Sequence, residues 1–251
     1  MPRFFIKDSD IDNNNTVTLY GDAASHISRS LRMRVGDGIT LCDGQKNEYR
    51  CIIEKMTSES VTLSVKEKVQ SANEPDVFVS VYQALPKSTK MELIIQKCVE
   101  LGVGEIIPVL SSRCISRPDD KSSKRKNERY NAISEEAAKQ SGRAFVPEVC
   151  ETMDFDSALS AMSNADAAFM CYEAAGNESY DIKAYLQNNL SEDTRTIAFF
   201  VGPEGGISPD EADKAIASGI VPITLGNRIL RTETAAMCVL SCIMYETNNL
   251  K

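Results

Sequence analysis

The spacing of apolar residues changes once along this chain of 251 residues, and the change falls near residue 75. Beyond that point, apolar runs of strand length alternate with longer amphipathic stretches. This alternation is typical of α/β layers around a largely parallel sheet. Before that point, short apolar runs follow one another with a single helical stretch among them. The change of period predicts an α/β fold preceded by a smaller β domain.

The first part is expected to form a small β-barrel. Its candidate strands lie at 3–6, 16–19, 38–42, 49–53 and 61–65. A helical stretch is expected at 22–33. The polar residues 66–75 break both periods, as a linker does. We therefore expect a first domain at residues 1–72 and a second domain at 73–251.

In the second part, the spacing of apolar residues predicts five strands and five helices. The strands are expected at 77–85, 105–110, 167–171, 196–201 and 221–225. The helices are expected at 88–101, 127–141, 180–190, 208–218 and 233–247. Residues 121–126 are all Lys, Arg or Ser, and we expect them to form an exposed loop.

The net charge of −8 argues against a protein that is positive over its whole surface, but the charge is unevenly spread. Residues 111–147 carry nine Lys and Arg against five Asp and Glu, whereas residues 148–220 carry three against fourteen. Phosphate affinity depends on local Lys and Arg rather than on the whole-chain sum. The basic segment is therefore either a nucleic-acid contact or a solvated surface.

The eight cysteines never form a C-x-x-C pair, and the chain has one histidine. We expect free thiols and no metal site built from His and Cys. Cys238 and Cys242 are spaced i,i+4 on the last predicted helix and are expected to pack in the core. No apolar run reaches the roughly 20 residues that span a bilayer, and the N-terminus turns polar too soon for a signal peptide. A soluble, cytoplasmic protein is expected.

A glycine-rich loop follows the predicted strand 196–201, with Gly202, Gly205 and Gly206 within five residues. The Ser-x-x-Glu pattern of a capping box then begins a helix at Ser208. Glycines at the carboxyl end of a buried strand let backbone groups approach a ligand. The loop lacks both the dinucleotide and the nucleoside-triphosphate fingerprints. Two interpretations stay open, a loop for another ligand and a tight structural turn.

A second loop follows the predicted strand 221–225 in the same way. Apolar Ile229 and Leu230 lie between Arg228 and Arg231, which suits a flat aromatic ligand beside an anion. Taken alone, each arginine is more often a surface or salt-bridge residue. We expect the two strands that precede these loops to be adjacent, so that their ends form one pocket.

Several segments occur in an order that points to one family. They read RFF at 3–5, LRMRVGD at 31–37, LPKSTKME at 85–92, QKCVELGV at 96–103, EAAKQSGR at 136–143, GPEGG at 202–206 and LGNRILRTETA at 225–235. Together they resemble the bacterial ribosomal RNA small subunit methyltransferase E family over nearly the whole chain. The glycine loop alone would indicate only the broader SPOUT methyltransferase superfamily.

The resemblance implies a PUA-like RNA-binding β-barrel at 1–72 and a SPOUT methyltransferase domain at 73–251. The last segments of that domain would thread a deep trefoil knot, which composition alone would not predict. The resemblance also implies a homodimer, S-adenosyl-L-methionine as methyl donor, and methylation of N3 of one uridine in 16S rRNA of the 30S subunit. Two alternatives stay open, a methyltransferase for another RNA and a non-catalytic RNA-binding module.

The resemblance also indicates which residues form the site. The expected cofactor-binding residues are Tyr172, Glu173, Val201, Gly202, Gly205, Gly206, Leu225, Gly226, Ile229 and Leu230. The arginines expected to contact RNA phosphates are Arg3, Arg29, Arg32, Arg34, Arg113, Arg117 and Arg143.

Two catalytic hypotheses accompany these assignments. Glu204 is a candidate base if burial raises its pKa, and otherwise a structural acceptor. Arg231 or Arg228 would stabilise negative charge on the uracil carbonyls, with a salt bridge to Glu233 as the alternative role.

Overall fold

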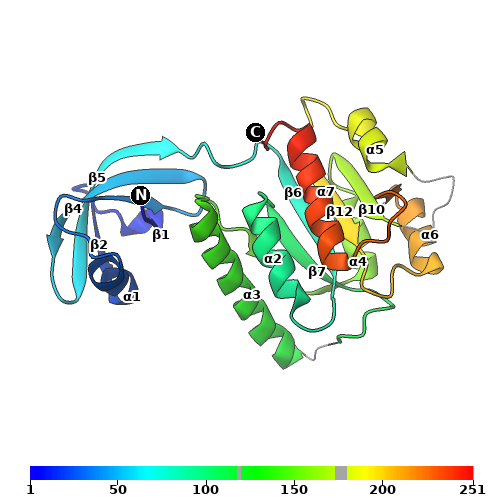
Figure 1. Ribbon diagram of the computed structural model, residues 1–251, viewed down its shortest axis with the longest axis horizontal. Helices are drawn as coiled ribbons and strands as arrows, with labels where there is room; N and C mark the ends of the chain where they lie inside the picture. Colours follow the sequence, from blue (N-terminus) through cyan, green and yellow to red (C-terminus); the bar gives the residue numbers. More distant parts are fainter. Residues whose placement is uncertain (118–119, 173–179, 251) are drawn as a thin grey trace. The chain divides into compact units, whose positions relative to one another are not determined.

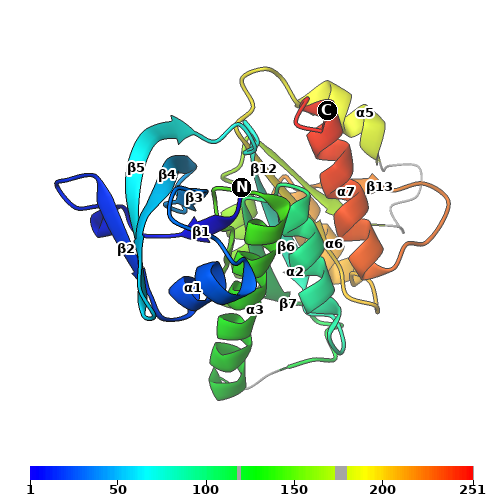
Figure 2. The same cartoon turned by 60° about the vertical axis from the view of Figure 1, so that its left-hand side comes forward.

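The computed structural model describes residues 1–117, 120–172 and 180–250. The chain divides into two compact units (Figures 1 and 2). The first unit comprises Met1–Glu74 and Ala138–Val146, and the second comprises Pro75–Ala137 and Pro147–Lys251. In the described ranges, no helix is both long and apolar enough to cross a membrane.

The first unit is built on a five-stranded sheet in the order β1-β3-β4-β5-β2. Its strands are β1 (Arg3–Phe5), β2 (Thr16–Tyr20), β3 (Gly38–Cys42), β4 (Asn47–Met56) and β5 (Ser60–Gln70). All five predicted strands are confirmed, although β5 extends into the expected linker. Because β1 and β2 are the two ends of this order, the described strand pairing does not close the sheet into a ring.

The predicted helix of the first unit is confirmed in position but is shorter than expected. A 3-10 turn at Asp8–Asp10 precedes β2, and α1 (Gly21–Ser25) follows it and continues as a π-helical stretch, His26–Ser30. The helix stops there because Arg32 has a φ of 53°, in the left-handed region. Ile27, which is fully buried, packs into the core of the sheet.

The second unit contains an eight-stranded sheet, and among the described residues all of its strand pairings are parallel, as predicted. Its strands are β6 (Phe78–Ala84), β7 (Glu105–Leu110), β8 (Glu148–Val149), β9 (Met153–Asp154), β10 (Ala167–Cys171), β11 (Tyr180–Asp181), β12 (Thr196–Val201) and β13 (Val221–Thr224). The order is β11-β13-β10-β12-β6-β7-β8, and β9 also pairs with β7. The five predicted strands are confirmed. The two-residue strands β8, β9 and β11 are too short to produce a hydrophobic period.

The helices of the second unit are α2 (Lys90–Glu100), α3 (Asp120–Ser141), α4 (Phe155–Met162), α5 (Ile182–Asn189), α6 (Pro209–Ala217) and α7 (Thr232–Glu246). The five predicted helices are confirmed, and α4 was not predicted. The side chains of Asp154, Asp181 and Ser208 cap α4, α5 and α6. The prediction of an exposed loop at 121–126 is wrong. These residues form the start of α3, because Lys and Arg favour helix and no Gly or Pro interrupts them.

Helices cover both faces of this sheet. Alternate residues such as Tyr82 and Phe200 pack with α4 and α6. The intervening residues, such as Val81 and Phe199, point to the other face and are fully buried. On that face α2 and α7 lie side by side (Figures 1 and 2). Since all the strands are parallel, the carboxyl ends of the neighbouring strands β13, β10 and β12 meet at one edge.

Candidate functional site

A pocket of about 450 Å³ lies at the carboxyl ends of β10, β12 and β13. Its lining comes mainly from the three segments that follow these strands. The prediction that β12 and β13 are adjacent is wrong, because β10 lies between them and adds Cys171 and Tyr172 to the pocket. The two glycine-containing loops nevertheless line one pocket, as expected.

Most of the expected cofactor-binding residues line this pocket. They are Tyr172, Val201, Gly202, Gly206, Leu225, Gly226, Ile229 and Leu230. Gly205 is exposed and is not part of the lining. Glu173 lies outside the described residues.

The backbone of the first loop favours glycine at two positions. Gly206 has a φ of 69°, in the left-handed region that side chains disfavour. A Cβ on Gly202 would lie 3.0 Å from Cγ1 of Ile207 and 3.3 Å from the carbonyl carbon of Gly206. The predicted capping box is confirmed, because Ser208 and Glu211 bond reciprocally. The loop is thus held between the end of β12 and a well-defined start of α6.

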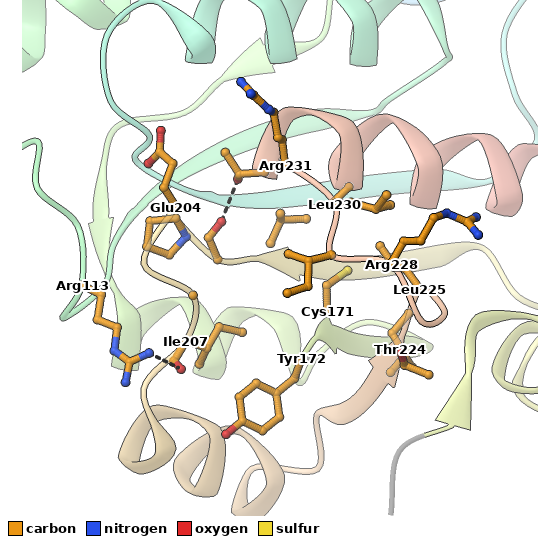
Figure 3. A pocket seen from close by; sticks show the side chains of 18 of the residues that line it. Arg113, Cys171, Tyr172, Glu204, Ile207, Thr224, Leu225, Arg228, Leu230 and Arg231 are labelled. Atoms are coloured by element: carbon orange, nitrogen blue, oxygen red, sulfur yellow. Dashed lines mark hydrogen bonds between the residues drawn. The ribbon is translucent and has the colours of Figure 1, made fainter. Parts of the chain in front are cut away.

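Arg113 holds this loop from the side. Its Nη1 donates to the carbonyl oxygens of Gly205, at 3.0 Å, and Ile207, at 3.3 Å. Figure 3 shows Arg113 reaching Ile207 from the segment that follows β7. Arg113 therefore stabilises the glycine loop. The sequence analysis had predicted only a contact with RNA phosphate for this residue.

The first turn of α7 is tied to the same loop. The Oγ1 of Thr232 donates to the carbonyl oxygen of Gly202 at 2.7 Å, and Nε2 of Gln83 donates to Oγ1 of Thr232 at 2.9 Å. Our sequence interpretation missed both residues. The available signal for Gln83 was an amide near the end of the mainly apolar run 77–85.

Glu204 forms an ion pair at the pocket. Its Oε1 lies 2.8 Å from Nζ of Lys90, and both carboxylate oxygens accept from the backbone N–H of Lys87. Burial would raise the pKa of Glu204, but these hydrogen bonds outweigh it, and the net pKa is below the ordinary value. The condition for a base role, a raised pKa, is not met, and the geometry is that of the structural acceptor.

Arg228 and Arg231 are exposed residues of the pocket lining. In Figure 3 the charged ends of Arg231 and Glu204 extend to the same side, away from Tyr172. The alternative salt bridge from Arg231 to Glu233 is not observed in the described part of the chain. Glu233 instead lies 3.6 Å from Nζ of Lys90.

The remaining arginines fall into two groups. Arg29, Arg32 and Arg34 are exposed. The other group already bonds to protein atoms. Arg3 pairs with Glu48 at 2.7 Å, Arg117 donates to the carbonyl oxygens of Ser111 and Ser112, and Arg143 pairs with Glu74 at 2.8 Å.

Arg143 was expected to contact RNA phosphates, but its side chain is only 5% exposed. Glu74 also accepts from the backbone N–H groups of Ala144 and Phe145. This buried network joins Ala138–Val146 to the rest of the first unit. We therefore withdraw Arg143 as a phosphate contact.

The cysteines are all free, as predicted. Cys238 and Cys242 are half-buried rather than part of a closed core. Cys171, which the prediction did not include, lines the pocket, and burial raises the pKa of its thiol to about 12. A thiol with this pKa stays protonated near neutral pH and contributes a small apolar surface.

Comparison with known proteins agrees with this geometry. Residues 73–244 match a family model described as an RNA methyltransferase domain, and residues 19–66 match an RNA methyltransferase PUA domain. The chain is 34% identical over 255 residues to the ribosomal RNA small subunit methyltransferase E of Bacillus subtilis (strain 168), covering 100% of this chain and 99% of that protein.

Two solved structures are similar over their whole length. The ribosomal RNA small subunit methyltransferase E of Neisseria gonorrhoeae, bound to S-adenosyl methionine, has a TM-score of 0.82 and 30% identity and covers 97% of each chain. A putative methyltransferase of Legionella pneumophila, in complex with the same cofactor, has a TM-score of 0.82 and 27% identity. It covers 97% of this chain and 96% of that one.

Proposed function

Because the chain belongs to the ribosomal RNA small subunit methyltransferase E family, we propose that it transfers a methyl group from S-adenosyl-L-methionine to N3 of one uridine in 16S rRNA. Family membership itself makes the chain an RNA methyltransferase that acts on small subunit rRNA. The pocket at the ends of β10, β12 and β13 is the observation that carries the methyl-donor part of the proposal, and the N3 position rests on the resemblance alone. The pocket lining includes eight of the ten residues that the resemblance implied.

The residues of the pocket fit S-adenosylmethionine. A cavity of about 450 Å³ lies in the range of small-molecule sites. Leu225, Ile229 and Leu230 offer apolar surface to an adenine ring, while Gly202 and Gly206 leave the backbone open to close approach. The loop lacks the lysine of a nucleoside-triphosphate site, in keeping with a cofactor that has no phosphate. The two similar structures that contain this cofactor support the assignment.

S-adenosyl-L-methionine, when bound, supplies a methyl group on a positively charged sulfur. The protein then has to align the uracil ring and stabilise the charge left when N3 loses its proton to water. Arg228 and Arg231 line the pocket, and their exposed guanidinium groups support a role in attracting negative charge on the uracil carbonyls. Glu204 is a weak proton acceptor, because Lys90 favours its ionised form. We assign charge stabilisation to the arginines and no base role to Glu204.

The target nucleotide has to present its N3 atom. N3 lies on the Watson–Crick edge of uracil, so the nucleotide must be unpaired or extruded before methyl transfer. Arg29, Arg32 and Arg34 are exposed in the first unit, which matches an RNA methyltransferase PUA domain. We assign phosphate contacts to these three arginines.

Further features implied by the resemblance belong to the same proposal. We propose an RNA-binding domain at 1–72, a methyltransferase domain at 73–251 with a C-terminal knot, a homodimer, and a cytoplasmic location where 30S particles assemble.

The proposal is tested by methyl transfer from labelled S-adenosyl-L-methionine to purified 30S particles that lack their own modifications. We expect 3-methyluridine in 16S rRNA, identified by mass spectrometry of the nucleosides. Another methylated nucleoside, or transfer only to another RNA, would contradict the assigned position or substrate. Absence of cofactor binding would instead favour the non-catalytic RNA-binding module.

A further inference from the structure

Gln83 occupies a position where the fold calls for an apolar side chain. It lies near the carboxyl end of β6 and shares a face of that strand with Val79 and Val81, because side chains alternate along a strand. Both valines are 0% exposed, and Gln83 is also 0% exposed. A primary amide at such a depth loses its hydrogen bonds to water and needs partners within the protein.

The donors and acceptors around Gln83 fix the direction of every hydrogen bond. Its Nε2 donates to the carbonyl oxygen of Ala84 at 2.8 Å, and the reversed amide would instead set oxygen against oxygen there. The hydroxyl of Thr232 has a single proton, and that proton is donated to the carbonyl oxygen of Gly202. Thr232 must therefore accept from Gln83, and the chain of bonds runs from Gln83 through Thr232 to Gly202.

This arrangement leaves one atom of Gln83 without a partner. Its Oε1 accepts no hydrogen bond from the described protein atoms, and only one other buried side-chain atom of those ranges, Oε2 of Glu233, shares this condition. A buried acceptor without a donor lowers stability, and an apolar residue of similar size would avoid that loss. The presence of the amide is therefore better explained by its effect on Thr232 than by core stability.

We propose that Gln83 is a positioning residue of the cofactor pocket, acting through Thr232 on the carbonyl group of Gly202. Gln83 is not among the lining residues, whereas Thr232 and Gly202 both are. The relay joins β6, the glycine loop after β12 and the first turn of α7. The relay sets the orientation of one backbone carbonyl group. Because the hydroxyl proton of Thr232 is donated to Gly202, Thr232 has no proton to donate to a bound ligand. This inference rests on the proposal that the pocket binds S-adenosyl-L-methionine.

Two substitutions at Thr232 separate the relay from simple packing. Thr232→Val keeps the shape of the side chain but removes the hydroxyl, and Thr232→Ser keeps the hydroxyl but removes the methyl group. The relay predicts that cofactor affinity, measured by calorimetry on the full chain, falls about tenfold in Thr232→Val. It also predicts that Thr232→Ser stays within about threefold of the wild type. The reverse order would overturn the relay in favour of packing.

A second pair of variants tests Gln83 itself. Gln83→Met removes the amide at similar length, and we expect weaker cofactor binding with little change in melting temperature, because the unpaired Oε1 is lost as well. Val81→Ala, in the same face of β6, is the matched control. It should lower the melting temperature by creating a cavity and leave cofactor affinity unchanged.

The outcomes distinguish the relay from the function on which it rests. If the wild type binds S-adenosyl-L-methionine and both Gln83→Met and Thr232→Val bind it equally well, the relay alone is overturned. If the wild-type chain does not bind S-adenosyl-L-methionine, the proposed function is overturned and the relay with it.

Discussion

Two arginines of the first unit show how the same residue type serves different roles. Arg143 is buried in an ion pair with Glu74, whereas Arg32 is exposed. Removal of one partner from a buried ion pair leaves an uncompensated charge, which is costly. Removal of an exposed arginine changes stability little but takes away a possible phosphate contact. The two roles therefore separate experimentally.

We expect Arg143→Ala to lower the free energy of unfolding by about 3 kcal/mol, because it leaves Glu74 buried without its cation. We expect Arg32→Ala to leave stability within about 0.5 kcal/mol of the wild type. Arg32→Ala should weaken RNA binding and reduce its salt dependence by about one phosphate contact. Denaturant unfolding and RNA titrations at several salt concentrations measure both effects. A salt dependence of Arg32→Ala equal to that of the wild type would remove Arg32 from the interface.

At the scale of elements, Glu211 joins the start of α6 to the segment after β7. Its carboxylate accepts from Ser208 in the capping box and from both the backbone N–H and the hydroxyl of Ser112. Burial would raise the pKa of Glu211, but the hydrogen bonds from Ser112 and Ser208 outweigh it and hold the pKa below its ordinary value. The glycine loop before α6 depends on this anchor.

A lowered pKa gives this anchor a defined pH dependence. Because the folded-state pKa of Glu211 lies below its unfolded value, its stabilising contribution is complete above the unfolded value and is lost as the pH falls through the folded one. We expect Glu211→Gln to cost about 1–2 kcal/mol at pH 7, the range of a lost cap. The difference from the wild type should shrink as the pH falls below about 4. Denaturant unfolding at several pH values measures it, and a difference that grows in acid would contradict the anchor.

The elements also show where sequence patterns are informative. The strands β6, β7, β10 and β12 were predictable because they are apolar runs long enough to be buried on both faces. The start of α6 was predictable from its capping residues. Helix α4 was missed although Phe155, Ala158, Leu159 and Met162 follow the i, i+3, i+4, i+7 spacing of one buried helix face. The start of α3 was missed because its charged residues were read as a solvated loop.

At the scale of the whole molecule, the site depends on contacts that no local pattern specifies. Gln83 and Thr232 are 149 positions apart, and Lys90 and Glu204 are 114 apart. Hydrophobic period identifies strands but not their order, so the position of β10 between β12 and β13 could not be deduced. The lining residues that were predicted from the sequence came mainly from the resemblance. Cys171, Lys90 and Thr232 could be identified as lining residues only from the fold.

The central claim is that the pocket at the ends of β10, β12 and β13 binds the methyl donor. Gly206 and Gly219 both have positive φ values, 69° and 82°, and both lie in the second unit, but only Gly206 lines the pocket. Valine at either position therefore imposes the same kind of backbone strain. The pair separates damage to the fold from damage to the pocket.

The most direct measurement is calorimetric titration of S-adenosyl-L-methionine into the wild type, Gly206→Val and Gly219→Val, with the folded state of each checked by its melting temperature. We expect the wild type and Gly219→Val to bind equally, and Gly206→Val to lose at least about a hundredfold in affinity, near 3 kcal/mol. Binding by a folded Gly206→Val with the affinity of the wild type would contradict the account.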